Sequence, residues 1–105
     1  MRFYYENNMG DNGFFRADDI VFAIYSAWNI EANLYLISSK EDIVKLDESI
    51  YNEQIFSPHE SNEYNSDLLY KWGLYVVDGE MYTEIKDIKT NEVRGYDWSE
   101  VLQLV

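Results

Sequence analysis

The segment that most constrains the fold covers residues 18–28, which read Asp-Asp-Ile-Val-Phe-Ala-Ile-Tyr-Ser-Ala-Trp. A helix built from this segment has apolar side chains almost all round, so we expect it to be buried rather than half exposed. The two leading aspartates favour a helix start because they offset the positive end of the helix dipole. Eleven residues is also long for a strand, and Ala23, Ser26 and Ala27 favour helix. The sequence therefore predicts a buried helix that ends near Asn29.

Strands are predicted on both sides of this helix. Residues 2–6 form a short aromatic-rich strand, and the turn formers of residues 7–13 end it. Residues 30–37 alternate between apolar and polar side chains, which is typical of a strand with one buried face. Apolar residues then recur at helical spacing among charged ones, so a second, amphipathic helix is predicted over residues 39–51.

The second half of the chain predicts a polar loop followed by strands. Residues 57–66 are polar and contain the single proline, so we expect an exposed loop. Residues 68–76 alternate with period two and predict a long strand. The dipeptide at residues 78–79, Asp-Gly, suits a two-residue hairpin turn, which predicts that residues 80–88 return antiparallel. Residues 92–98 would add the third strand of a meander.

These elements predict one α+β domain covering residues 1–105. The expected order is β-α-β-α-β-β-β, with two helices packed on a mainly antiparallel sheet and a C-terminal three-stranded meander. A chain of 105 residues is long enough for one hydrophobic core, and two separate cores would each be marginal. A hydrophobic content of 47% supplies the apolar surface that such a core needs.

The net charge of −12 limits the partners that the protein can have. The chain holds 20 acidic and 8 basic residues, and this excess repels phosphate backbones and anionic lipid head groups. We therefore expect neither direct nucleic-acid binding nor membrane binding. An acidic surface attracts basic surfaces, which are common on proteins that handle nucleic acid. The alternative is that the charge only keeps a small protein soluble.

Several kinds of chemistry are disfavoured by residues that the chain lacks. The absence of cysteine excludes disulfides, thiolate nucleophiles and cysteine zinc sites, and it favours a reducing compartment. No segment has the length and apolar character of a signal peptide or a membrane span. His59 is the one histidine, so a site built from several imidazoles is excluded. We predict a cytoplasmic protein that is not an enzyme and has no metal or cofactor.

Two weak motifs leave an enzymatic alternative open. His59 and Glu63 have the spacing of a zinc-protease motif, but the second position lacks the histidine that the metal requires. Asp78, Glu84 and Lys86 have the residue types of a restriction-type nuclease core, in which carboxylates hold magnesium and a lysine assists the attacking water. A nuclease also needs a basic track for its substrate, which this composition does not supply.

The acidic residues cluster in one part of the sequence. Residues 41–67 contain eight acidic residues and one basic residue, Lys45, which accounts for more than half of the net charge. Tyrosine and tryptophan are enriched at binding hot spots, and the chain has 10 tyrosines and three tryptophans. We therefore predict a partner-binding surface of acidic residues and tyrosines within and beside this cluster. Its members are Glu41, Asp42, Asp47, Glu48, Tyr51, Glu53, Glu60, Glu63 and Tyr64.

Such a surface predicts an inhibitor that occupies a basic groove in competition with nucleic acid. In size, charge and lack of catalytic residues the chain resembles the small acidic proteins with which phages and mobile elements disable host nucleases, including anti-CRISPR and DNA-mimic proteins. The expected partner is then a CRISPR effector, a host nuclease or another nucleic-acid-binding complex. One alternative is an immunity protein or antitoxin that neutralises a cognate toxin. A second alternative is the small metal-dependent enzyme built on Asp78, Glu84 and Lys86.

Overall fold

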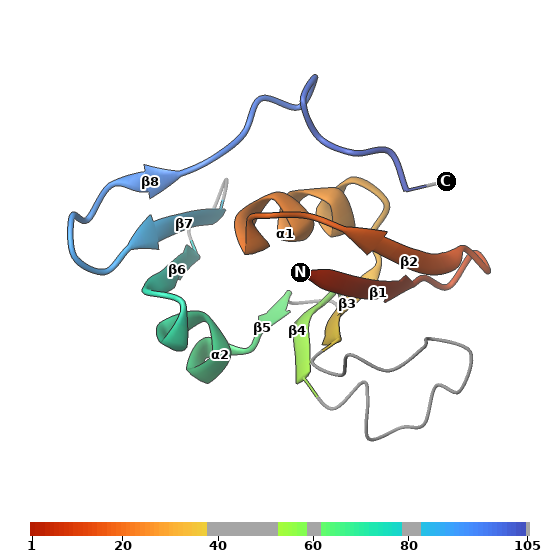
Figure 1. Ribbon diagram of the computed structural model, residues 1–105, viewed down its shortest axis with the longest axis horizontal. Coiled ribbons are helices and arrows are strands. Elements are labelled where there is room, and N and C mark those ends of the chain that lie inside the picture. The colour runs from red at the N-terminus through yellow and green to blue at the C-terminus, as the bar shows by residue number, and fades with distance from the viewer. Residues whose placement is uncertain (38–52, 59–61, 79–82, 105) are drawn as a thin grey trace.

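The computed structural model describes residues 1–37, 53–58, 62–78 and 83–104, which form the α+β fold that the sequence predicts (Figure 1). Two helices accompany two antiparallel sheets, one with strand order β2-β1-β3-β4-β5 and one with order β6-β7-β8. The elements are β1 (Arg2–Glu6), β2 (Asn12–Arg16), α1 (Ile20–Asn29), β3 (Asn33–Ile37), β4 (Glu53–Ser57), β5 (Glu63–Tyr64), α2 (Ser66–Lys71), β6 (Leu74–Asp78), β7 (Thr83–Asp87) and β8 (Val93–Arg94).

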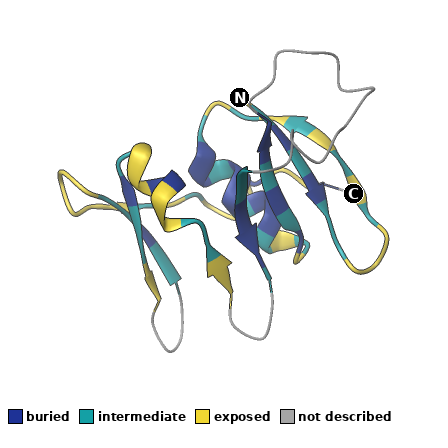
Figure 2. Ribbon diagram, turned by 90° about the horizontal axis from the view of Figure 1, so that it is seen from below, coloured by how far each residue is buried: buried dark blue, intermediate teal, exposed yellow. Residues whose placement is uncertain are grey.

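Helix α1 is buried, as its apolar sequence predicts. Its N-cap is Asp19, whose carboxylate accepts a hydrogen bond from the Val21 amide at 3.0 Å. Ile24 on this helix is fully buried in one cluster with residues of the large sheet, such as Phe3. The same cluster contains Ile85 from the small sheet, so a continuous apolar core joins the two sheets. Figure 2 shows this buried layer between the helix and the strands that face it.

Strand β1 lies inside the large sheet, between β2 and β3. Phe3 pairs with Phe15 of β2 on one side and with Leu36 of β3 on the other. Because side chains alternate along a strand, Phe3 and Tyr5 both point into the core, whereas Tyr4 points to the opposite face. On that opposite face Tyr35 pairs with Tyr4 and donates a hydrogen bond to Glu6 Oε1 at 3.2 Å.

The Tyr35 hydroxyl predicts a loss of stability at alkaline pH. Burial, and then the charge and hydrogen bond of Glu6, raise the pKa of Tyr35 from 10.0 to about 12. A raised pKa means that the folded state retains the proton longer than the unfolded state does. The stabilisation is therefore complete below pH 10 and is lost as the pH rises towards 12. Urea unfolding at about pH 8 and about pH 11 should show a smaller loss for Tyr35→Phe than for the wild type, and equal losses would contradict this assignment.

Three parts of the predicted secondary structure are wrong. Strands β2 and β4 were not predicted, and β5 lies inside the predicted loop of residues 57–66, where it pairs with β4. The long strand predicted over residues 68–76 begins instead as helix α2, whose N-cap Asn65 accepts from the Leu68 amide at 3.1 Å. Gly73 follows the end of α2 in the left-handed conformation, with a φ of 75°. Trp72, which the predicted strand would place on the apolar face, is 46% exposed.

The C-terminal meander is confirmed, with one correction to its first turn. Strand β7 pairs antiparallel with both β6 and β8. The last pair of the first hairpin joins Asp78 to Thr83, which leaves residues 79–82 between them, so a two-residue turn at residues 78–79 is wrong. The helix predicted over residues 39–51 lies outside the described residues.

Candidate functional site

Three residues of the predicted acidic surface fall within the described part of the chain. Glu53 begins β4 and is partly exposed, and Glu63 on β5 is exposed. Tyr64 follows Glu63 but points the other way, into a pocket, because adjacent residues of a strand face opposite sides. The structure therefore separates Tyr64 from the outward carboxylate beside it. The other predicted surface residues lie outside the described residues: Glu41, Asp42, Asp47, Glu48, Tyr51 and Glu60.

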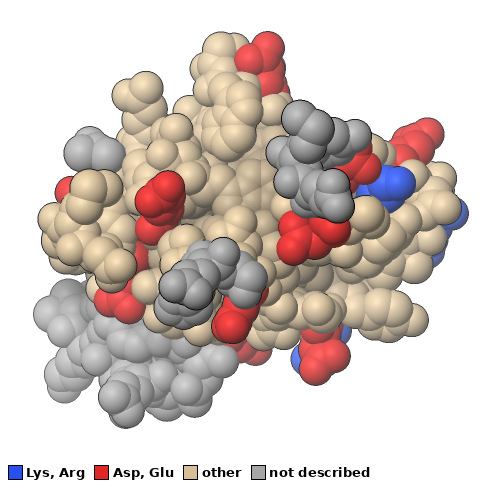
Figure 3. All heavy atoms as spheres, turned by 180° about the vertical axis from the view of Figure 1, so that it is seen from behind, with Lys and Arg blue, Asp and Glu red and all other residues tan. Residues whose placement is uncertain are grey.

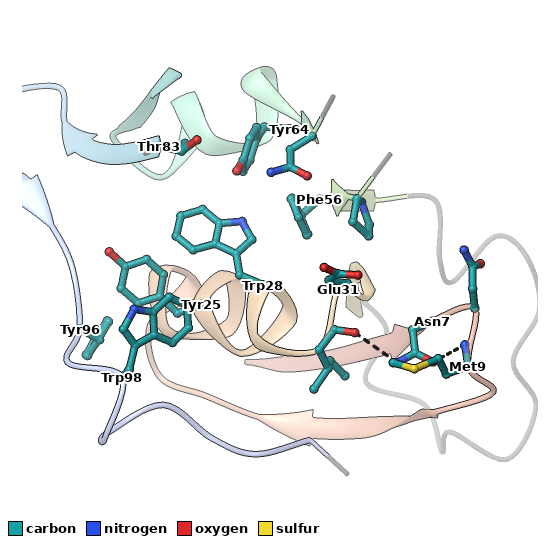
Figure 4. A pocket seen from close by; sticks show the side chains of 14 residues that line it. Asn7, Met9, Tyr25, Trp28, Glu31, Phe56, Tyr64, Thr83, Tyr96 and Trp98 are labelled. Atoms are coloured by element: carbon teal, nitrogen blue, oxygen red, sulfur yellow. Dashed lines mark hydrogen bonds between the residues drawn. The ribbon is translucent and has the colours of Figure 1, made fainter. Parts of the chain in front are cut away.

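The pocket that Tyr64 lines lies where the helix α1, the large sheet and the C-terminal segment meet (Figure 4). Its volume is about 700 Å³, within the range of small-molecule and peptide sites. The described residues that line it come from the β1–β2 turn, α1 and the chain just after it, the β4–β5 region, β7 and the C-terminal segment. They are Asn7, Asn8, Met9, Tyr25, Trp28, Ile30, Glu31, Phe56, Pro58, Asn62, Tyr64, Thr83, Tyr96 and Trp98.

Aromatic rings form a continuous wall of this pocket. Trp98 stacks on Tyr25 with ring centroids 5.5 Å apart, and Tyr25 lies 4.7 Å from Trp28. Trp28 then meets Tyr64 edge to face, with an angle of 90° between the ring planes. Figure 4 shows Trp28 in the centre of this row, between Trp98 and Tyr25 on one side and Tyr64 and Phe56 on the other. The rings from Trp98 to Trp28 therefore lie at shallow angles to one another, 24° and 37°, and the wall turns sharply at Tyr64.

Two polar atoms of this wall are buried without a hydrogen-bond partner among the described residues. They are Nε1 of Trp28 and Oη of Tyr64, which face each other in Figure 4. Burial raises the pKa of the Tyr64 hydroxyl most strongly. The side chains of Trp28, Thr83 and Asn62 lower this pKa, and the Asp78 carboxylate raises it. The influence of Asp78 means that negative potential reaches this end of the pocket. Because both atoms are covered, a ligand meets the ring faces rather than these atoms.

Glu31 places a carboxylate at the pocket in a strained backbone conformation. Its φ is 51°, in the left-handed region that glycine usually occupies after a helix, and this costs a non-glycine residue about 1 kcal/mol. Its amide donates to the Trp28 carbonyl at 3.3 Å, which closes the end of α1. Among the described residues its exposed carboxylate has no hydrogen bond or ion pair. A charged side chain thus occupies a position where glycine would be more stable.

The C-terminal segment is held against α1 by Asp19. The carboxylate Oδ2 of Asp19 accepts from Arg94 Nη2 at 2.7 Å and from the Tyr96 hydroxyl. The hydrogen bond to Asp19 is the main reason why the pKa of Tyr96 is raised. Between them, Gly95 lies so close to the Tyr25 ring that an added Cβ would be 2.9 Å from the hydroxyl oxygen. These contacts bring Tyr96 and Trp98 to the pocket.

The opposite rim of the pocket is fixed by Asn7. Its side-chain oxygen accepts from the amides of Met9 and Asp11, at 3.0 and 2.9 Å. Its side-chain nitrogen donates to the carbonyl of Ile30, just after α1, at 3.2 Å. One side chain therefore shapes the β1–β2 turn and ties it to the end of the helix.

The residues of the nuclease alternative do not converge. Asp78 lies opposite Thr83 in the hairpin, and its Oδ1 accepts a hydrogen bond from the Thr83 hydroxyl at 2.7 Å. Glu84 and Lys86 lie on the other face of the hairpin, because Glu84 is the next residue after Thr83. They form a weak ion pair with a separation of 3.8 Å. Within the described ranges, no three His, Cys, Asp or Glu side chains lie close enough together to hold a metal ion.

Sequence reasoning found one residue of the aromatic wall, Tyr64, and missed the others. Tyr25 and Trp28 are three residues apart and therefore share a helix face, but the apolar residues all round α1 concealed this face. Trp98 reaches the wall from a distant part of the chain. The left-handed backbone of Glu31 has no sequence signal, because glutamate is not a residue that usually adopts it.

Comparisons with known proteins give no family or relative: no family model, curated protein or solved structure matches the chain. No helix in the described part of the chain is long and apolar enough to cross a membrane. Function is therefore inferred from the pocket and the charges themselves.

Proposed function

We propose that this protein binds a basic protein that handles nucleic acid, such as a nuclease or a CRISPR effector, and blocks access of nucleic acid to it. The observation that carries this proposal is the net charge of −12 on 105 residues. A surface with this excess of carboxylates is attracted to the grooves that bind phosphate backbones, and it competes with nucleic acid for them.

The pairing of the described charges supports the proposal. Only two ion pairs join the described residues, Arg94 with Asp19 and Lys86 with Glu84. Figure 3 shows Asp and Glu side chains spread over one face of the molecule, with Lys and Arg confined to its margins. Carboxylates that are not neutralised within the protein remain available to a basic partner.

The first test is a pull-down with the wild-type protein at low and high salt, followed by mass spectrometry of the retained proteins. We expect one basic nuclease or nucleic-acid-binding complex that is lost as the salt concentration rises. Recovery of a toxin would instead favour the immunity function. If low salt retains no basic protein, the proposal is wrong for the proteome tested.

Neutralising part of the predicted surface should weaken this interaction. The change replaces Glu41 and Glu48 with Gln and Asp42 and Asp47 with Asn. Loss of four carboxylates at the contact is expected to reduce the affinity about 10-fold or more at low salt and to flatten its salt dependence. Titration of the captured partner at several salt concentrations measures both effects.

A control variant separates a local surface from total charge. It removes four carboxylates elsewhere, at Asp18, Glu84, Glu92 and Glu100, and so has the same net charge as the first variant. If the predicted surface makes the contact, this control should keep most of the affinity. Equal weakening by both variants would show that only long-range attraction matters and would reject the predicted surface.

A further inference from the structure

We propose that the aromatic pocket receives the side chain of an arginine from the basic partner. This inference rests on the proposed function and names the chemistry of one of its contacts. The pocket combines the two groups that recognise a guanidinium ion, namely exposed ring faces and a free carboxylate.

The ring faces supply the first group. One face of the Trp98 indole ring stacks on Tyr25. Because Trp98 is 59% exposed, the other face is open to a ligand. The faces of tryptophan and tyrosine rings carry negative potential, and a planar guanidinium stacks on them. An exposed tryptophan that is fixed by stacking is also the kind of residue that dominates protein interfaces.

The charges supply the second group. Glu31 lies at the pocket with its carboxylate unpaired among the described residues, and Asp78 adds negative potential at the Tyr64 end. The C-terminal end of helix α1, which also lies here, carries the negative end of the helix dipole. Of the described residues that line the pocket, none is Lys, Arg or His. Negative charges therefore attract a cation to the pocket, and the nearby Arg94 is neutralised by its ion pair with Asp19.

The backbone of Glu31 points to the same conclusion. Glycine would fit its left-handed conformation without strain, yet the chain has a glutamate there. Strained positions of this kind occur where the side chain has a function that offsets the loss of stability. Ion pairing with an incoming arginine gives this carboxylate such a function.

An arginine on a protein fits this pocket better than a small free cation does. The volume of about 700 Å³ exceeds what a lone ammonium ion fills, and it can hold a long side chain together with its neighbouring backbone. The net charge of −12 brings basic protein surfaces to the molecule, and such surfaces are rich in arginine.

The test uses the peptide acetyl-Gly-Gly-Arg-Gly-Gly-amide and the same peptide with citrulline, which is neutral and nearly the same shape. Binding is followed by the NMR shifts of the three tryptophan indole N–H signals. We expect the arginine peptide to bind about 10-fold more tightly than the citrulline peptide, with the largest shifts at Trp28 and Trp98. Equal affinities, or no saturable shifts, would overturn the proposal.

Two variants and two controls locate the site. Trp98→Ala and Glu31→Gly should each weaken the arginine peptide about 5-fold or more. Glu31→Gly also gives the left-handed position its preferred residue, so its unfolding midpoint in urea should not fall. Trp72→Ala removes another half-exposed tryptophan and Glu92→Gln another exposed carboxylate, and both should bind like the wild type. If the controls weaken the peptide as much as the two variants do, the pocket is not the site.

Further experiments distinguish a small free cation from an arginine side chain, and distinguish failure of the pocket proposal from failure of the proposed function. Tetramethylammonium that binds as tightly as the arginine peptide would overturn the assignment to a protein side chain. A basic partner that Trp98→Ala and Glu31→Gly retain as well as the wild type would leave the proposed function standing and reject this pocket as its contact. A pocket that binds the arginine peptide in a protein that captures no basic partner would reject the proposed function instead.

Discussion

Replacement of Phe3 by alanine should lower the free energy of unfolding by about 3–5 kcal/mol, because it leaves a cavity in the middle of the large sheet. Phe3 is fully buried on the interior strand β1 and stacks on Phe15 with centroids 5.3 Å apart. It belongs to the cluster that also contains Ile24 of α1 and Ile85 of the small sheet, so the cavity would weaken both sheets. Urea unfolding of the purified variant measures the loss.

Phe14→Ala is the matched control for this change. Phe14 lies on the opposite face of the same sheet, where it is 39% exposed and packs against Tyr4. We expect it to cost about 1 kcal/mol, because an exposed ring leaves no closed cavity. Similar losses for the two phenylalanines would mean that the core does not lie on the α1 side of the sheet.

Replacement of Asp19 by alanine should lower the free energy of unfolding by about 2–3 kcal/mol. The change removes the N-cap of α1 and the acceptor of the hydrogen bonds from Arg94 and Tyr96. The N-cap contributes about 1 kcal/mol, and the two bonds to a charged acceptor contribute the rest. The Arg94 side chain is 42% exposed, so solvent screening keeps its share of this total small.

Two further variants test whether the loss comes from the cap and hydrogen bonds of Asp19. Asp19→Asn keeps a good capping side chain and removes the charge, so it should cost about half as much as alanine. Asp18→Ala removes the neighbouring exposed carboxylate and should change the stability by less than about 0.5 kcal/mol. If Asp18→Ala is as destabilising as Asp19→Ala, the effect comes from charge near the helix start and not from these hydrogen bonds.

The parts of the fold that the sequence predicts are those with a clear local signal. Helix α1 is a long apolar segment that begins with aspartates, and the meander contains a hairpin signal, so both are predicted. Strand β2 was missed because it begins Asn-Gly, which is a turn signal. Gly13 occurs there because the Tyr5 ring covers it, leaving 3.1 Å between an added Cβ and the Tyr5 hydroxyl oxygen. The glycine at this position is therefore required by packing between two strands, although in the sequence it resembles a turn residue.

Helix α2 was missed for a different reason. Leu68, Tyr70 and Trp72 recur at every second position as in a strand, but the buried pair is Leu68 and Leu69, two consecutive residues. The N-cap Asn65 favours the helix because its side-chain oxygen accepts a hydrogen bond from the Leu68 amide. Its side-chain nitrogen donates to the Gln54 carbonyl of β4, which fixes the cap in place. This tertiary contact is invisible in the local pattern.

The pocket was only partly predictable because its described residues come from five separate parts of the chain. Tyrosine and tryptophan content predicted that some aromatic residues would lie at a binding surface, and Tyr64 was among those named. Its neighbours in the wall are set by tertiary structure: the Asp19 contacts bring Trp98 to Tyr25 across more than 70 residues. The charge of Glu31 could be read from the sequence, whereas its backbone conformation could not.

The bond between Asp19 and Tyr96 also orders events during synthesis on the ribosome. The first two strands can form a hairpin as soon as residue 16 has emerged, since a short turn joins them. The contacts that hold the C-terminal segment against α1, in contrast, wait for Arg94 and Tyr96, which leave the ribosome almost 80 residues later. The aromatic wall is therefore assembled last, because Trp98 completes it only after the rest of the pocket has been synthesised.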